Sequence, residues 1–271
     1  MKKFIIVCVT LFLVMASSCS RVPITNRKQL KLLPESLILS MSLTNYTEFL
    51  SQNPALPASE PNVQLVRNVG GKISQAVIGF MREQGKLKQI KNYKWEFNLV
   101  NNSTVNAWCM PGGKIVVYTG ILPYTEDEYG LATVIGHEIA HAVARHGNER
   151  LSQQLALTLG EVTLAVALQD KPKETKDIFL SVYEIGGTLG ALAYSRLHEY
   201  EADKLGMIFM ARAGYDPAKA IEFWQRMADL SKGKPQIPQF LSTHPSDENR
   251  IKALREFLPK AQRYYKPSNS K

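Results

Sequence analysis

Residues 136–147 spell Gly-His-Glu-Ile-Ala-His-Ala-Val-Ala-Arg-His-Gly and contain the pattern His-Glu-x-x-His. On an α-helix, residues four apart lie on one face, about 6 Å apart along the axis. His137 and His141 in that geometry can bind one zinc ion, and Glu138 then lies beside the remaining metal position, where a water molecule would sit. The pattern predicts a zinc hydrolase in which Glu138 is the general base toward that zinc-bound water.

The flanking residues predict the helix that this arrangement needs. Thr125-Glu126-Asp127-Glu128 has the Thr-x-x-Glu pattern of a capping box and predicts a helix start, and Gly147 predicts its end. A core helix with two hydrogen-bonded histidines is the alternative, but a five-residue pattern in helical surroundings favours the metal site. Apolar residues at helical spacing form a buried stripe: Leu131, Val134, Ile135, Ile139 and Ala142.

A catalytic zinc ion needs a third protein ligand and an open position, and the candidates lie in a second helical segment, residues 195–203. Glu199 and Asp203 are four apart and share one helix face. We therefore predict Glu199 as the third ligand. Asp203 is predicted to accept the second N–H of a zinc-bound histidine, which fixes the tautomer of that ring. Glu201 points elsewhere and is predicted to be solvated or ion-paired; an exposed charged face is the alternative for the whole segment.

His-Glu-x-x-His followed at a distance by Ser-Arg-x-x-Glu-x-x-Ala-Asp resembles the zinc metallopeptidase family of the CAAX prenyl endoproteases, which includes the HtpX, Oma-type, BepA and LoiP proteases. The matching residues are His137, Glu138, His141, Ser195, Arg196, Glu199, Ala202 and Asp203. Over roughly residues 60–260, the resemblance also includes Asn106-Ala107, Pro111-Gly112-Gly113-Lys114-Ile115, Tyr118-Thr119-Gly120 and Thr243-His244-Pro245-Ser246. It implies the same third ligand, Glu199, as the helix-face argument, and one zinc ion per chain.

The elements around the motifs, together with the resemblance, imply an α+β fold. This would be a mainly α-helical, gluzincin-type metallopeptidase domain with a small β-sheet beside the active-site helix. A helix is predicted over residues 63–84, and short strands over 95–100, 105–110 and 114–118, with a turn at Pro111-Gly112-Gly113.

Four further helices are predicted in the second half of the chain. Residues 151–168 and 178–193 are unusually apolar, but polar residues interrupt both, so buried or partner-facing helices are favoured over membrane spans. Asp216-Pro217 predicts a helix that continues to Leu230. Ser246 is predicted to start the last helix, which runs through Arg250 to Phe257.

The N-terminus predicts export from the cytoplasm. Lys2 and Lys3 precede an apolar run over residues 4–15, and small residues then precede Cys19. This three-part layout is typical of a signal peptide, here residues 1–18, and the apolar run is too short to span a membrane.

The residues around Cys19 predict lipidation of its side chain. Ala16 replaces the usual leucine of a lipoprotein signal, so ordinary secretion with a nearby cleavage is the alternative. Ser20 is not an aspartate of the kind that retains lipoproteins in the inner membrane. The predicted location is the cell envelope, as a periplasm-facing lipoprotein held to the membrane by its lipid, and the outer membrane if the source is Gram-negative.

Three parts are predicted after the signal peptide: a tether with a short helix over residues 19–60, the metallopeptidase domain over 61–260 and a basic tail over 261–271. The formal net charge is +9, but no dense basic cluster stands out, which favours a generally basic surface over a contact with anionic lipid or lipopolysaccharide. No nucleic-acid motif stands out, so no nucleic-acid partner is expected. Cys109 has no expected disulfide partner and is predicted to be a buried packing thiol.

Further site residues are predicted around the metal. The resemblance places a substrate-binding strand edge at Asn106-Ala107. His244 is the candidate donor to the oxyanion, with a structural or helix-capping histidine as the alternative; in some relatives, a matching histidine is thought to cover the metal as a gate. Arg196 is predicted to form an ion pair near the site or to contact substrate. His146 and His198 are predicted to be packing or surface residues.

These features predict a zinc-dependent metalloendopeptidase of the cell envelope. Misfolded, unfolded or stalled envelope proteins are the expected substrates and partners, because an extended chain can pair with a sheet edge. One alternative is a chaperone or assembly factor with a gated, rarely cleaving zinc site. A second, a binding lipoprotein with a structural zinc, is disfavoured because structural zinc sites are usually closed by four protein ligands.

Overall fold

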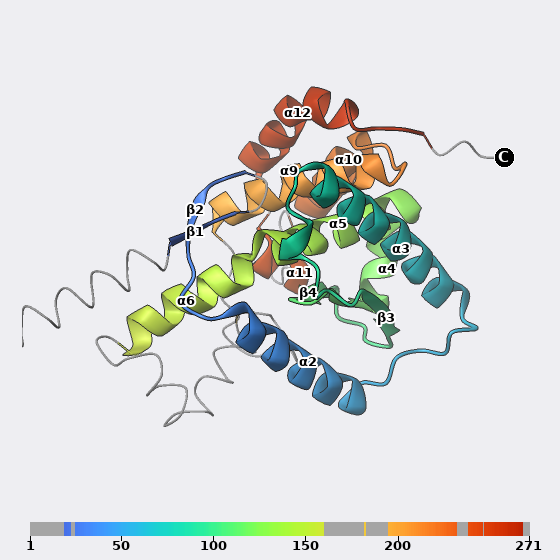
Figure 1. The fold of residues 1–271 in the computed structure, drawn as a ribbon. Helices are drawn as coiled ribbons and strands as arrows, with labels where there is room; N and C mark the ends of the chain where they lie inside the picture. The colour runs from blue at the N-terminus through green and yellow to red at the C-terminus, as the bar shows by residue number, and fades with distance from the viewer. Residues whose placement is uncertain are drawn as a thin grey trace, which may run out of the picture.

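The computed structural model describes residues 19–22, 25–159, 182, 195–231, 238–245 and 247–267 (Figure 1). The predicted signal peptide and most of the two apolar segments between residues 151 and 193 lie outside these residues. No helix among the described residues combines the length and the apolar character that crossing a membrane requires.

Helix α5 (Glu128–Ala144) runs through the middle of the molecule and carries the His-Glu-x-x-His motif (Figure 1). All its side chains after the first two positions are buried, as expected for a helix that is apolar on nearly every face. It packs against α3 (Pro61–Glu83), α9 (Arg196–Arg212) and α10 (Ala218–Ser231) and also contacts a small β-sheet.

The start of α5 differs from the capping box predicted at Thr125. Asp127 is the N-cap, and its carboxylate accepts the backbone N–H groups of Tyr129 and Gly130 at 2.9 and 2.8 Å. Thr125 instead ends a short helix, α4 (Leu122–Thr125), and its hydroxyl donates to the carbonyl of Leu122. The predicted cap is wrong because the chain turns sharply between α4 and α5, at Glu126 with φ of 63°, and an aspartate follows that turn.

The end of α5 also differs from the prediction, which placed it at Gly147. Arg145 ends the helix in the left-handed conformation, with φ of 61°, and Gly147 lies within the next helix, α6 (His146–Leu159). A non-glycine residue rarely adopts this conformation. Here the guanidinium of Arg145 donates to the carbonyl of Gln89 and forms an ion pair with Glu35 at 2.9 Å, which holds the turn in place.

The sheet contains the three predicted strands, β3 (Glu96–Val100), β4 (Ala107–Met110) and β5 (Lys114–Tyr118), in the order β3-β5-β4. β3 and β5 are parallel, whereas β4 and β5 form an antiparallel hairpin. The hairpin turns at Gly112 and Gly113, where φ is 90° and 80°. One face of the sheet, which includes Ala107 and Cys109, packs toward α5, and β4 lies at an edge.

Two further helices, α3 and α10, lie close to where they were predicted. α3 corresponds to the periodic segment 63–84, and α10 follows Asp216, whose side chain accepts the N–H of Ala218. A short helix, α11 (Gln239–Thr243), precedes α12 (Glu248–Gln262). The cap of α12 is Asp247 rather than the predicted Ser246, because its carboxylate accepts the N–H of Arg250 at 2.8 Å.

Residues 19–60, predicted to be a tether with one short helix, contain two paired strands, β1 (Cys19–Arg21) and β2 (Lys28–Leu30), and the helix α2 (Glu35–Gln52). α2 covers the face of the sheet opposite α5, where Phe49 packs edge-on against Trp108 with ring centroids 5.0 Å apart. This segment therefore adds a second, smaller core to the domain.

Two glycines bring α5 and α9 into backbone contact. A Cβ atom at Gly136 would lie 3.2 Å from the carbonyl oxygen of Gly206, and one at Gly206 would lie 3.1 Å from the amide nitrogen of His137. The helices therefore approach as closely as their backbones allow, directly beside the first histidine of the motif.

The mainly helical α+β fold, with a small sheet beside the motif helix, is confirmed.

Candidate metal centre

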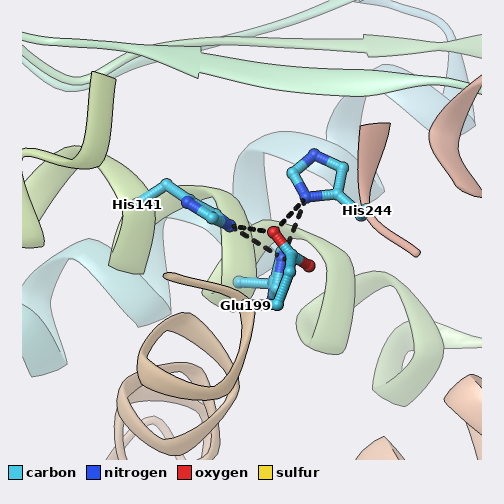
Figure 2. A group of neighbouring side chains, drawn as sticks. His141, Glu199 and His244 are labelled. Carbon is cyan, nitrogen blue, oxygen red and sulfur yellow. Dashed lines mark hydrogen bonds and ion pairs between the residues drawn. The ribbon is translucent and has the colours of Figure 1, made fainter. Parts of the chain in front are cut away.

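Four buried side chains from three helical segments point toward one another. His137 and His141 come from α5, Glu199 comes from the first turn of α9, and His244 directly follows α11. Figure 2 shows His141 and His244 on either side of the Glu199 carboxylate. None of the four is exposed by more than 2%, so the group is closed to solvent.

The distances between the facing atoms fit a tetrahedral metal site. His137 Nε2 lies 3.0 Å from His141 Nε2 and 3.3 Å from both His244 Nδ1 and Glu199 Oε2. Glu199 Oε1 lies 3.3 Å from His141 Nε2 and 3.1 Å from His244 Nδ1. Four ligands at about 2.0–2.1 Å from a tetrahedral zinc ion would stand about 3.3 Å apart. The donor set and its spacing therefore fit zinc.

His137 contacts Asp203, the residue predicted to accept the second N–H of a zinc-bound histidine. Its Nδ1 lies 3.0 Å from Asp203 Oδ1, one helical turn after Glu199 on α9. Burial alone would lower the pKa of His137, but the negative charge of Glu199 and the hydrogen bond to Asp203 outweigh it and raise this pKa to about 9. Burial lowers the pKa of His141 well below its usual value and that of His244 to about 4. Zinc binds the neutral form of imidazole, so a zinc ion would displace the proton that His137 carries at neutral pH.

Arg250 is a member of the site that the sequence analysis missed. It lies on α12, is 1% exposed, and donates to both oxygens of Asp203 at 2.6 and 2.8 Å. Its guanidinium also pairs with Glu199 at 2.8 Å and lies 3.6 Å from the ring centre of Trp224. The only signal in the sequence is its position in register with Leu254 and Leu258 on the apolar face of that helix.

Arg196, predicted to lie near the site, is not brought into it. It is the first residue of α9, its side chain is 78% exposed, and within the described part of the chain it pairs with Asp247 at 3.8 Å. At the start of α9, Arg196 is solvated, while the buried acidic groups further along the helix receive their positive charge from Arg250.

Glu138 and the β4 edge lie beside the four donors. Glu138 is 3% exposed, and its carboxylate lies 3.4 Å from Nε2 of His244. Burial, with a further contribution from the charge of Glu138, raises the pKa of the free Cys109 thiol well above its usual value, as expected for a packing thiol near that carboxylate. Asn106 is fully buried just before β4; its Oδ1 accepts the N–H of Ala107, and its Nδ2 has no hydrogen-bond partner among the described residues.

A second buried polar cluster lies behind His141, and it includes residues predicted to be peripheral. His146 Nδ1 lies 2.9 Å from His141 Nδ1, and His146 Nε2 lies 3.0 Å from Glu201. Arg27 bridges Glu201 and Glu149 at 2.8 and 2.7 Å. Of the two states predicted for Glu201, solvated or ion-paired, the structure shows the ion-paired one: α6 and the N-terminal hairpin formed by β1 and β2 bury the side chain, which pairs with Arg27 and His146.

Glu149 gives the fold a dependence on acid. Burial opposes its ionisation, but hydrogen bonds from His198 and Arg27 lower its pKa from 4.5 to about 2. A carboxyl group with a depressed pKa stabilises the fold above its unfolded-state pKa and loses that contribution as the pH falls toward the folded-state value. Urea denaturation of the zinc-free protein should therefore show a steeper loss of unfolding free energy between about pH 4.5 and 2 than in Glu149→Gln. Parallel pH profiles would contradict this.

Comparison with known proteins agrees with the geometry. Residues 74–258 match peptidase family M48. The mitochondrial metalloendopeptidase OMA1 of Schizosaccharomyces pombe is 36% identical over 244 residues, which cover 89% of this chain and 67% of the relative. The OMA1 of Homo sapiens is 29% identical over 246 residues, covering 88% of this chain but 46% of its own length.

A bacterial relative aligns over a shorter region. The beta-barrel assembly-enhancing protease of Yersinia pestis is 32% identical over 168 residues, which cover 59% of this chain and 34% of the relative. The resemblance inferred from the two motifs is therefore confirmed. With the buried His/His/Glu/His group in place, this chain belongs to peptidase family M48 and is a metalloendopeptidase.

Proposed function

We propose that this metalloendopeptidase hydrolyses peptide bonds in unfolded or stalled proteins of the cell envelope. It would use one zinc ion held by His137, His141 and Glu199. The observation that carries the proposal is the convergence of these donors at tetrahedral spacing, with the carboxylate of Glu138 beside them.

The chain's own residues have separate tasks in this reaction. A bound zinc ion would act as a Lewis acid toward the scissile carbonyl. Glu138 would take a proton from the attacking water and deliver it to the leaving amine. Asp203 orients His137 through Nδ1, while Arg250 holds the carboxylates of Asp203 and Glu199 in place.

The preference for unfolded substrates rests on the edge of the sheet. β4 pairs only with β5, lies against α5 and leaves one edge without a strand partner among the described residues. An extended peptide can add to such an edge through backbone hydrogen bonds. The buried Nδ2 of Asn106 is a hydrogen-bond donor at the start of that edge. Most extended segments of a folded protein are already paired in its own sheets, whereas those of an unfolded or stalled protein are free to pair with this edge.

His244 is better placed to close the site than to assist an oxyanion. Its Nδ1 lies in the donor group itself, 3.1 Å from Glu199 and 3.3 Å from His137. A fourth protein donor fills the position that water and substrate need in a catalytic site. We therefore propose that the resting enzyme is latent and that His244 must leave before substrate enters.

Digestion of casein by zinc-loaded parent protein and by His244→Ala tests this function. If the open state is a minor population of about 0.1–10%, removing the gate should raise cleavage by about 10- to 1000-fold. A chelator should abolish cleavage in both proteins, and added zinc should restore it. Slower cleavage by His244→Ala, with zinc still bound, would return His244 to the role of oxyanion donor.

The second candidate function is that of an envelope chaperone with a rarely cleaving site. The complete burial of all four donors favours it. If neither protein cuts casein although both contain one zinc ion per chain, while both suppress aggregation of unfolded proteins, the chaperone function replaces the peptidase function.

The proposed location is the cell envelope, with lipid on Cys19 as the membrane anchor. β1 begins at this residue, so the anchor would hold the domain directly against the membrane. Cys19→Ala should move the protein from the membrane fraction to the soluble fraction after a salt wash of the cell envelope. A variant that stays with the membranes would show that another part of the chain holds it there.

A further inference from the structure

The Nδ1 atoms of the two α5 histidines contact different kinds of group. Nδ1 of His137 faces the carboxylate of Asp203 at 3.0 Å. Nδ1 of His141 instead faces Nδ1 of a second histidine, His146, at 2.9 Å. His146 is fully buried and is the first residue of α6, directly after the left-handed turn at Arg145.

The hydrogen atoms in this contact can be assigned from the contacts alone. A neutral His141 that binds metal through Nε2 carries its hydrogen on Nδ1. Two ring nitrogens 2.9 Å apart form a hydrogen bond only when one of them carries the hydrogen. Nδ1 of His146 must then be the acceptor, and the hydrogen of His146 lies on Nε2.

Glu201 imposes that same tautomer from the other side. Its Oε2 lies 3.0 Å from Nε2 of His146 and also accepts from Nε of Arg27 at 2.8 Å, while its Oε1 accepts the hydroxyl of Thr25. The ion pair with Arg27 and the hydroxyl donated by Thr25 keep Glu201 in its carboxylate form. An ionised carboxylate can only accept hydrogen bonds, so His146 must donate through Nε2.

We propose that His146 is a positioning residue that fixes the tautomer and ring orientation of His141, and that Glu201 fixes His146 in turn. The proposal rests on the proposed metal role of His141. The carboxylate that supports His141 is displaced by one ring and paired with Arg27, whereas the carboxylate that supports His137 contacts it directly and is paired with Arg250. The N-terminal hairpin, which carries Arg27, thereby becomes part of the support of the metal site.

Nitrogen NMR of the zinc-loaded parent protein tests the tautomer without any substitution. In protein labelled with ¹⁵N-histidine, the ring nitrogens of His146 should show a protonated Nε2 and an unprotonated Nδ1. A hydrogen on Nδ1 of His146, with or without one on Nε2, would overturn the proposal, because that nitrogen could then not accept from His141.

Two substitutions of His146 that match each other in shape separate the effect of losing the hydrogen-bond acceptor from the effect of changing the side-chain volume. In His146→Asn, the side-chain oxygen can take the place of Nδ1 and accept from His141. His146→Leu has the same shape as the asparagine variant but no acceptor. We expect the leucine variant to bind zinc about 10- to 100-fold more weakly, as for other residues that orient metal ligands, and the asparagine variant to recover most of this loss. Zinc affinity is measured by competition with a chromophoric chelator.

His198→Leu controls for the loss of a buried histidine from the same cluster. His198 is 3% exposed, stacks on His146 with ring centroids 4.5 Å apart and pairs with Glu149. The His198→Leu substitution should leave the zinc affinity unchanged. Equal affinities in His146→Asn and His146→Leu would overturn the inference, and if the leucine variant does not fold, the NMR measurement decides.

Failure of this inference can be told apart from failure of the proposed function. If the parent protein binds no zinc, or if His141→Ala binds zinc as tightly as the parent does, the proposed metal site is wrong. If the parent binds zinc through His141 but His146 shows the opposite tautomer, the metal site stands and only the positioning role is lost.

Discussion

Glu138→Gln should lose cleavage while keeping its zinc. The amide has the shape of the carboxylate but cannot take a proton, and removal of a general base typically costs about 100- to 10,000-fold in rate. Glu138 lies outside the group of four donors, and its carboxylate lies 3.4 Å from Nε2 of His244. Zinc content should therefore stay at one ion per chain.

Measuring both cleavage and zinc content shows whether Glu138 acts as the general base or as a metal ligand. Casein digestion gives the rate, and elemental analysis of the purified variant gives the metal. Cleavage retained in Glu138→Gln would assign the base to another group. Loss of both cleavage and zinc would make Glu138 part of the metal-binding set, and it could then not be assigned as the base from this variant.

Arg250→Met should destabilise the protein by about 3–5 kcal/mol, the usual cost of removing one partner from a buried ion pair. The guanidinium lies between the carboxylates of Asp203 and Glu199, and all three side chains are at most 4% exposed. Methionine fills much of the space but leaves two buried negative charges without their cation. The free energy of unfolding in urea, measured on zinc-free protein, gives the effect directly.

Two further variants keep this prediction specific. Arg196→Met removes a 78% exposed arginine and should change the unfolding free energy by no more than about 0.5 kcal/mol. Asp203→Asn added to Arg250→Met should recover part of the lost unfolding free energy, because it removes one of the two unpaired negative charges. If Arg250→Met is as stable as Arg196→Met, the buried ion pair does not support the fold.

The long periodic helices and the strands could be predicted from the sequence, but the ends of the helices could not. The apolar periodicity of α3 and α5 and the Gly-rich turn between β4 and β5 are local patterns, and the structure reproduces them. Thr125 and Gly147 failed as boundaries because α5 is capped two residues away from each of them, at Asp127 and Arg145. Asp127 offered a better cap, and contacts to Gln89 and Glu35 held Arg145 in a conformation that its own backbone disfavours.

The part of the site on single helices was predictable, and the part assembled from distant elements was not. Residues four apart on one helix must share a face, so spacing alone pairs His137 with His141 and Glu199 with Asp203. Arg250 meets Asp203 only because α12 docks on α9. The cluster of His146, Glu201 and Arg27 likewise depends on α6, α9 and the N-terminal hairpin meeting behind α5. No local pattern records which faces of these elements meet.

Because of the glycine contact between α5 and α9, the donors on these two helices are less mobile than His244. Where two backbones touch at Gly136 and Gly206, no side chain remains to yield, so the donors on these helices move as one rigid block. His244 follows a helix of only five residues, whereas the other three donors lie on helices of 17 residues. In hydrogen–deuterium exchange, the amides of α5 and α9 would exchange only through global unfolding, while those of α11 would exchange through a smaller, local opening. The slow-exchanging core and the reactive centre would thus share the same helices, and access to the metal would open from one side alone.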